Sequence, residues 1–317
     1  MKEPSTVRGT VIRIDAGQSH VDTPLGVLRC VLRGRLTSER PGAKPKGPRA
    51  PATEAALAVG DQVEVLVTVA GQGAIEQVLP RRTKLSRRAV GPGKREQIVA
   101  ANVDQMVIVT SAPAPSLNLI DRYLVAASRG GLQPVICINK IDLGIPAGLA
   151  EDLAPYTELD YPVHWTSAVT GSGIPEFRAQ LAQVTSVLAG KSGVGKSALL
   201  TAVDPQLALR SAPISAATGK GRHTTSFSSL LPLAGGGYVI DTPGIREYTL
   251  WEIEPRDLDQ HFPDIAQFAA ECRFDDCAHR QEPDCGVKAA LADGRLPERR
   301  YASYSRIRNG LDDDALD

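Results

Sequence analysis

The chain has 317 residues, of which 42% are hydrophobic and 23% charged, a composition typical of soluble globular proteins with two or three domains. It contains no run of about eighteen apolar residues, and its first stretch, "MKEPSTVRGT", lacks the apolar core of a signal peptide. The 36 basic residues balance 36 acidic ones, which excludes a general attraction of the whole chain to nucleic acid. With five cysteines and no export signal, we expect a cytoplasmic protein without a membrane partner, and we expect it to be a monomer.

Residues 1–85 are predicted to form a small β-barrel. Five stretches read as short strands between glycine-containing turns: "VRGTVIRID", "GQSHVDT", "GVLRCVLRGRL", "DQVEVLVTV" and "GAIEQVLP". They fit an OB-type barrel, although an SH3-like barrel fits nearly as well. Residues 37–56, between the third and fourth strands, are rich in Pro, Gly, Lys and Arg and predict a long basic loop.

The barrel carries basic residues but no aromatic ones. Seven Lys or Arg residues and no acid lie between Arg81 and Arg95, and residues 1–100 contain no Phe, Tyr or Trp. OB folds that bind single strands stack bases on aromatic rings, which this barrel lacks. We predict that it grips folded RNA through phosphates, using the 81–95 run, and reads shape rather than sequence.

Residues 86–250 are predicted to form an α/β domain. "DQMVIVTSA" and "QPVICINK" read as buried strands separated by the helix "NLIDRYLVAASRGG", and the alternation continues to "GGYVIDTPG". Such alternation predicts a parallel sheet with helices on both faces. Residues 251–317 are polar, mostly helical and cysteine-bearing, and are expected to form a third unit.

The stretch "GKSGVGKS" follows a strand and opens a helix, which is the context of a phosphate-binding loop. Its glycines let backbone N–H groups face the phosphates, Lys196 should reach the β and γ phosphates, and Ser197 should ligate Mg²⁺. The expected nucleotide contacts here are Gly190, Lys191, Ser192, Gly193, Val194, Gly195, Lys196, Ser197 and Ala198.

The stretch "NKID" follows a buried strand and reads as a guanine reader. Asp142 can accept two hydrogen bonds from guanine, whereas adenine would leave it unpaired, which argues against an ATPase. Asn139 could bind the base or brace the phosphate loop, and the stem of Lys140 could cover the ring. In "TSAVTGSG", the N–H near Ala168 would donate to guanine O6, with Ser167 small enough to allow the approach.

Two further stretches predict the γ-phosphate sensors. In "DTPG", Asp241 would hold Mg²⁺ through a water and the N–H of Gly244 would sense the γ-phosphate. The stretch "GKGRHTTS" suits a switch that orders when a threonine hydroxyl reaches Mg²⁺. We prefer Thr225 to Thr224 for that ligand.

The residue that orients the attacking water in many GTPases is missing. Ile245 follows "DTPG", where a glutamine is common, and an isoleucine side chain cannot position water. His223 is the nearest candidate to take over as the catalytic group. The alternative is that His223 contacts RNA or solvent.

Clustered cysteines near the C-terminus predict a structural zinc site. Three thiolates and one imidazole within a short stretch make a closed set for tetrahedral Zn²⁺. The four residues are Cys272, Cys277, His279 and Cys285. The remaining cysteines, Cys30 and Cys137, fall in predicted strands and are expected to be small core residues.

The order of the motifs predicts a circular permutation. The base reader precedes the phosphate loop here, and rotating the list of motifs restores the ordinary GTPase order. A sheet domain tolerates such a cut because its native termini lie near each other at the surface. "DTPG" now leads directly into the third unit, and we hypothesise that nucleotide state moves that unit relative to the barrel.

The barrel, "NKID", "GKSGVGKS", "GKGRHTT", "DTPGIRE" and the Cys–Cys–His–Cys set together resemble the ribosome small-subunit-dependent GTPases of the RsgA family over essentially the whole chain. The resemblance implies a circularly permuted P-loop GTPase domain between an OB barrel and a helical zinc-binding module. It also implies a factor that binds the 30S subunit late in maturation, hydrolyses GTP faster when docked, and contacts ribosomal RNA through the barrel and the zinc module. By the same resemblance His223 is the catalytic group.

Two other functions stay open at this point. One is a GTP-gated rRNA-binding placeholder in which hydrolysis serves only release, which differs in whether a His223→Ala protein still leaves the subunit. The other is a permuted GTPase of the large subunit, which fits the barrel and the cysteine set less well.

Overall fold

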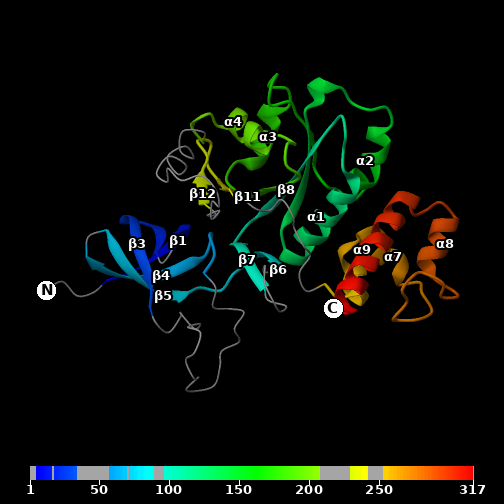
Figure 1. Ribbon diagram of the computed structural model, residues 1–317, viewed down its shortest axis with the longest axis horizontal. Coiled ribbons are helices and arrows are strands. Elements are labelled where there is room, and N and C mark those ends of the chain that lie inside the picture. The colour runs from blue at the N-terminus through cyan, green and yellow to red at the C-terminus, as the bar shows by residue number, and fades with distance from the viewer. Residues whose placement is uncertain are drawn as a thin grey trace, which may run out of the picture.

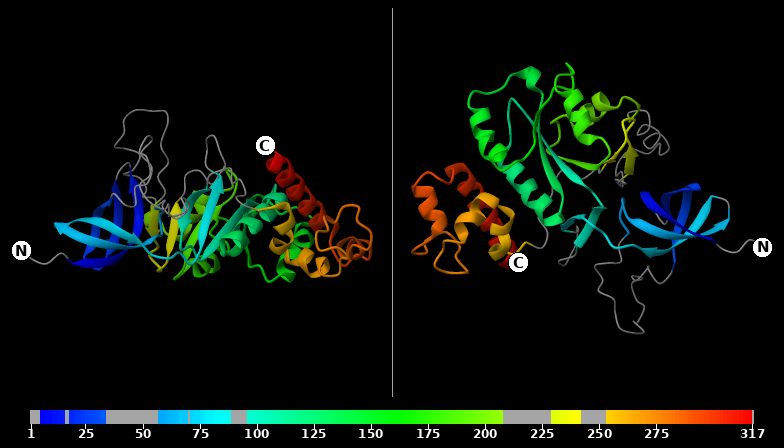
Figure 2. Two further views of the ribbon diagram at one scale, coloured as in Figure 1. Left: turned by 90° about the horizontal axis from the view of Figure 1, so that it is seen from below. Right: turned by 180° about the vertical axis from the view of Figure 1, so that it is seen from behind.

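The computed structural model describes residues 5–15, 18–33, 57–69, 71–88, 96–207, 229–241 and 253–316. Three units follow one another along its longest axis (Figure 1): a barrel, a central α/β domain and a helical C-terminal module. The views from below and from behind show the same elongated arrangement, with the central domain between the other two units (Figure 2).

The N-terminal unit is a five-stranded barrel. Its strands are β1 (Thr6–Asp15), β2 (Gln18–Thr23), β3 (Gly26–Leu32), β4 (Gln62–Val69) and β5 (Gln72–Val78). They pair in the order β1-β2-β3-β5-β4, the barrel closes through β1 and β4, and β3 runs parallel to β5. Alternate residues such as Val11, Val21 and Ile75 fill its core. The five predicted strands are confirmed, and the strand order selects the OB-type barrel.

A six-stranded sheet forms the centre of the second unit. Its order is β10 (Val163–Trp165), β9 (Gln133–Asn139), β8 (Gln105–Ser111), β11 (Thr185–Ala189), β13 (Tyr238–Asp241) and β12 (Ser229–Pro232). The first five strands are parallel, as predicted, whereas β12 is antiparallel to β13. β12 continues into the barrel through the Arg13–Ser229 pair with β1.

Helices cover both faces of this sheet, as the alternating sequence predicts. They are α1 (Leu117–Gly130), α2 (Leu149–Glu158), α3 (Ile174–Leu181) and α4 (Lys196–Val203). Helices α1 and α2 pack on the face that carries Ile108 and Ile136, and α3 and α4 pack on the face that carries Val107 and Val135. Successive strand residues point to opposite faces of a sheet. Since neighbouring residues in the middle of β8 and of β9 are apolar, both faces of these strands are apolar.

A hairpin of β6 (Lys84–Arg88) and β7 (Glu96–Ala101) joins the barrel to the central domain. The predicted boundary after residue 85 falls inside this hairpin. Arg81, the first residue of the basic run, donates to both oxygens of the fully buried Asp61, at 2.6 and 2.7 Å. Lys84 lies 2.7 Å from Glu96 on the neighbouring strand. Part of the basic run therefore holds the fold together.

The C-terminal module is helical, as predicted. It comprises the 3₁₀ helix η2 (Pro255–His261) and the helices α7 (Pro263–Ala269), α8 (Gly286–Ala292) and α9 (Glu298–Leu316). Its core includes Val125 from α1 of the central domain, and Ser128 of the same helix lies 2.9 Å from the ring nitrogen of His261. Across the described ranges, no helix has the length and apolarity that a bilayer crossing needs.

A buried ion-pair network fastens this module to the central domain. Arg300 on α9 is only 1% exposed and donates to Asp264 on α7, at 2.6 and 2.8 Å, and to the fully buried Asp121 on α1. Burial alone would lower the pKa of Arg300, but the two carboxylates raise it above its usual value. We call these three residues the Arg300 clamp.

Aromatic rings and a second arginine surround the Arg300 clamp. The guanidinium of Arg300 lies 4.9 Å from the ring centroid of Phe262 and 5.2 Å from that of Tyr156. The Tyr156 hydroxyl donates to Asp121 at 2.7 Å and accepts a bond from Arg299 at 2.7 Å. The buried charges in this cluster compensate one another. Removing one partner would leave another buried charge without full compensation.

We predict that Asp121→Asn lowers the free energy of unfolding by about 3 kcal/mol, because the substitution removes one of the two carboxylates that compensate the buried guanidinium of Arg300. Urea unfolding at fixed metal concentration measures the loss. Glu64→Gln is the matched control, since Glu64 pairs at 3.4 Å with Arg8, whose side chain is 75% exposed. The control should change stability by about 0.5 kcal/mol or less. Equal effects of the two substitutions would contradict the assigned role of the clamp.

Candidate nucleotide and metal sites

The phosphate loop connects β11 to α4 and depends on two close backbone approaches. A Cβ on Gly190 would come within 2.2 Å of the carbonyl oxygen of Val109, and a Cβ on Gly195 within 2.4 Å of Asn139 Nδ2. Gly195 also has a φ of 99°. Both positions therefore require glycine. Lys196 Nζ donates to the carbonyls of Gly190 at 2.7 Å and Lys191 at 2.9 Å, which holds the ammonium across the loop.

The base reader is tied to the phosphate loop by Asn139. This side chain is 1% exposed, and its Nδ2 donates to the carbonyl oxygen of Val194 at 2.9 Å. Its Oδ1 accepts from Thr166 Oγ1 at 3.3 Å and from the N–H of Ala168 at 3.4 Å. Of the two roles that the sequence leaves open for Asn139, the geometry matches the brace. Three loops that are far apart in the sequence thus converge on one amide.

Asp142 is held at the surface beside the Ala168 loop. It lies in the 3₁₀ helix η1 (Ile141–Leu143), which begins directly after Lys140, a residue in the left-handed conformation with a φ of 64°. Ser167 Oγ donates to Asp142 Oδ1. Asp142 is exposed, whereas Ser167 is fully buried. An exposed carboxylate oriented by a buried hydroxyl can accept hydrogen bonds from a planar ligand that enters from solvent.

All of these residues lie at the carboxyl ends of parallel strands, where ligands bind in open α/β sheets. β9 leads to Asn139, β10 to Ser167 and β11 to Gly190, and β13 ends beside β11 at Asp241. The other predicted switch residues, His223, Thr224, Thr225, Gly244 and Ile245, lie outside the described residues, as does the side chain of Asp241.

The comparisons with known proteins agree with this geometry. The model of the family described as RsgA GTPase matches residues 78–251. A protein of Gemmatimonas aurantiaca named small ribosomal subunit biogenesis GTPase RsgA is 40% identical over 312 residues, covering 97% of this chain and 98% of the relative. The protein of the same name from Chlorobaculum parvum is also 40% identical, covering 97% and 99%.

The chain belongs to the RsgA GTPase family. It is therefore a GTP-hydrolysing enzyme.

Two solved structures of similar proteins match the RsgA fold seen here. The crystal structure of YjeQ from Thermotoga maritima aligns with a TM-score of 0.72 at 34% identity, covering 97% of this chain and 99% of that one. The structure of YloQ, described as a circularly permuted GTPase, aligns with a TM-score of 0.70 at 30% identity, covering 98% and 96%. The predicted permutation, with a barrel before it and a helical module after it, is confirmed.

The four predicted metal ligands converge in the C-terminal module. The sulfur atoms of the three cysteines and one ring nitrogen of His279 all lie within 4.8 Å of one another. His279 Nδ1 lies 3.5 Å from Cys272 Sγ and 3.4 Å from Cys285 Sγ, so Nδ1 is the nitrogen that faces the sulfurs. Three sulfurs and one imidazole nitrogen fit a closed tetrahedral site, and the cluster can hold a metal ion.

The other nitrogen of His279 is held by a residue that the sequence motif does not contain. Nε2 lies 2.9 Å from Asp259 Oδ2, and the Tyr304 hydroxyl donates to the other oxygen of Asp259. The hydrogen bonds of His279 and Tyr304 keep the pKa of Asp259 below its usual value, although burial alone would raise it. A carboxylate on Nε2 fixes the tautomer in which Nδ1 is free to bind a metal. Asp259 lies well before the cysteines, and no local pattern marks it.

Burial affects the protonation of the thiols in this cluster. Burial raises the pKa of Cys277 to about 12 in the metal-free protein, so this thiol is protonated at neutral pH. It must lose its proton to become a thiolate ligand, and metal binding therefore releases a proton.

The two cysteines outside the cluster are buried in strands, as predicted, and burial raises the pKa of Cys30 to about 11 and of Cys137 to about 12. Neither thiol is reactive at neutral pH.

We predict that Asp259→Asn weakens metal affinity by about 10- to 100-fold, because the ring of His279 loses the carboxylate that orients it. Competition with a chromogenic chelator, using the full chain, measures the affinity. Asp257→Asn is the control, since it removes a carboxylate from the same 3₁₀ helix that does not contact His279. A metal affinity unchanged by Asp259→Asn would show that the hydrogen bond to Nε2 has no part in binding.

Proposed function

We propose that this GTPase binds the small ribosomal subunit, assists its late maturation, and hydrolyses GTP to GDP and phosphate faster when docked. The two relatives described above, which align over nearly the whole chain, carry the name small ribosomal subunit biogenesis GTPase. The observation that carries the proposal is the convergence of the base reader and the phosphate loop on Asn139, between a barrel and a metal-binding module. We further propose that the protein acts as a cytoplasmic monomer.

The positions of the loops support the nucleotide contacts that we propose. Asp142 would accept from guanine, with Lys140 against the ring and the Ala168 N–H on O6. The backbone N–H groups of the phosphate loop and Lys196 would bind the phosphates. GTPases use Mg²⁺ with the nucleotide, and Ser197 is exposed at the start of α4, where its hydroxyl could ligate the ion.

The γ-phosphate side of the site is proposed from sequence alone. Asp241 would hold the ion through a water, Gly244 would contact the γ-phosphate, and Thr225, rather than Thr224, would complete the ligands. His223 would orient the attacking water, because Ile245 cannot.

Zinc is the ion that we propose for the Cys₃His cluster, since a tetrahedral set of thiolates and imidazole suits Zn²⁺. With four protein ligands the shell is full, so the ion would shape the module rather than take part in hydrolysis.

We infer that this module and the barrel contact ribosomal RNA. Arg81 pairs with Asp61 and Lys84 pairs with Glu96, so phosphate contacts from the 81–95 run would come from other residues, such as Arg82, whose side chain is 68% exposed.

The decisive test is GTP turnover by the purified protein alone, with small ribosomal subunits, and with large subunits as the control. We expect strong stimulation by small subunits only. Stimulation by neither subunit, or by both equally, would contradict the proposed partner.

His223→Ala should then lower the stimulated rate by about 100-fold or more while leaving GTP affinity unchanged. A His223→Ala protein that turns over normally would remove His223 from the mechanism.

We predict that Asp142→Asn weakens GTP binding roughly 100-fold or more, because both hydrogen bonds to guanine lose their charged acceptor. The same variant should gain affinity for xanthosine triphosphate, whose base presents a carbonyl oxygen where guanine has its amine. Equilibrium titration with labelled nucleotides measures both affinities. Asp152→Asn, which changes an exposed acid on α2, is the control. An Asp142→Asn protein that keeps its preference for GTP would contradict the assignment of the base reader.

A further inference from the structure

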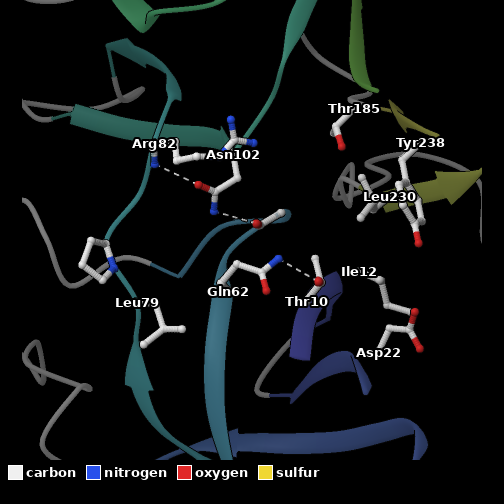
Figure 3. A pocket seen from close by; sticks show the side chains of 12 residues that line it. Thr10, Ile12, Asp22, Gln62, Leu79, Arg82, Asn102, Thr185, Leu230 and Tyr238 are labelled. Atoms are coloured by element: carbon white, nitrogen blue, oxygen red, sulfur yellow. Dashed lines mark hydrogen bonds between the residues drawn. The ribbon is translucent and has the colours of Figure 1, made fainter. Parts of the chain in front are cut away.

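A cleft of about 380 Å³ lies where the barrel, the hairpin and the central sheet meet. The barrel contributes the outer faces of β1, β2 and β4, and the central domain contributes the starts of β11 and β13 together with β12. Figure 3 shows the labelled side chains arranged around a central opening, with Tyr238 and Leu230 on one side and Gln62 and Leu79 on the other. This volume is in the range of sites that hold a small molecule.

The walls of the cleft are fixed by hydrogen bonds. Asn102 accepts from the N–H of Arg82 and donates to the carbonyl of Gly60, both at 2.9 Å, which ties the hairpin to the barrel. Gln62 donates to Thr10 Oγ1 at 2.8 Å, which orients its amide at the barrel wall. Ligand sites are usually largely preformed in this way.

The cleft contains an aromatic ring that the barrel itself lacks. Tyr238 is 36% exposed, and in the described part of the chain only Phe274 is a comparably exposed aromatic side chain. Apolar side chains, Leu230 and the half-buried Ile12, line the cleft near the ring. A planar base can therefore lie on Tyr238 with apolar contacts at its edges, as in proteins that bind single-stranded nucleic acids.

The charged groups of the cleft define an orientation for such an occupant. Arg82 and Asp22 lie on opposite sides of the opening (Figure 3), and both are exposed. Arg82 pairs at 2.9 Å with Asp104, but its side chain is 68% exposed, and an exposed pair of this kind is weak. A phosphate is attracted to the Arg82 side and repelled from the Asp22 side, where a carboxylate can accept from the N–H groups of a base.

We propose that this cleft binds one unstacked nucleotide, with its base on Tyr238 and its phosphate at Arg82. The chemistry is that of a nucleoside monophosphate, which could be free or part of a single-stranded RNA segment. The proposal rests on the RNA contact proposed above and adds a site to it. It also adds single-strand recognition to a barrel that has no ring of its own, because the ring comes from the central domain.

The position of Tyr238 connects the cleft to the GTP site. Tyr238 and Asp241 begin and end the same four-residue strand, β13, and Asp241 opens the "DTPG" stretch. An occupant of the cleft therefore contacts the strand that leads to the predicted γ-phosphate sensor.

Binding of a fluorescent hexa-adenylate to the full-length protein tests the proposal, with GDP and Mg²⁺ in excess so that the guanine site is filled. Because Tyr238→Leu removes the ring on which the base would stack, it should weaken oligonucleotide binding about tenfold. Tyr238→Phe keeps the ring and should keep the affinity. Arg82→Gln, on the opposite wall, should weaken binding and reduce its dependence on salt. Phe274→Leu is the matched control, since it removes a comparably exposed ring outside the cleft.

Ultraviolet crosslinking of the same oligonucleotide, mapped by mass spectrometry, should label the peptide that contains Tyr238. Competition by adenosine monophosphate would show that free nucleotides enter the cleft, and tight oligonucleotide binding without such competition would show that RNA is the source. Equal affinities for Tyr238→Leu, Phe274→Leu and the unchanged protein, with no crosslink at Tyr238, would overturn the proposal. Stimulation of GTP turnover by small subunits would survive that result, so the two proposals can fail separately.

Discussion

The Arg300 clamp constrains the rest of this structure more than any other interaction described. Arg300 joins Asp121 of the central domain to Asp264 of the C-terminal module, and all three side chains are buried. Separating the two units would break the bonds that Arg299 and Arg300 make with Asp121. Val125 adds an apolar contact from the same helix as Asp121. We infer from these contacts that the central domain and the C-terminal module act as one body.

The barrel is joined to that body in a different way. Its β1 meets the central sheet through the Arg13–Ser229 pair and packs Ile12 and Ile14 against the central core, and a further connection is the hairpin, held at Asn102 and Gly60. The cleft lies between these two connections. If nucleotide state moves the metal-binding module relative to the barrel, the module must travel with the central domain, and the change must occur at this junction. The proposed nucleotide-dependent motion is thus a motion at the junction between the barrel and the central domain.

Much of this architecture could be predicted from the sequence because its signals are local. The strand periodicity of the barrel, the glycines of the phosphate loop and the spacing of the cysteines can each be read within a short stretch. The partners of the polar groups could not be read in this way. Asp121 and Arg300 are 179 positions apart, and Asp259 lies 20 positions from His279. The basic run suggested RNA contact throughout, whereas Arg81 serves Asp61 inside the fold.

The Arg300 clamp predicts that the C-terminal module and the central domain move together, and measurements of interdomain distances test this most directly. Fluorophores on unnatural amino acids at Glu176, Lys288 and Gln72, all exposed, would report on the central domain, the module and the barrel without disturbing the metal-binding cysteines. Energy transfer between positions 176 and 288 should be the same with GDP and with a non-hydrolysable GTP analogue, while transfer between positions 176 and 72 changes. A change between positions 176 and 288 would contradict the account, because it would mean that the module moves against the central domain despite the buried ion pairs.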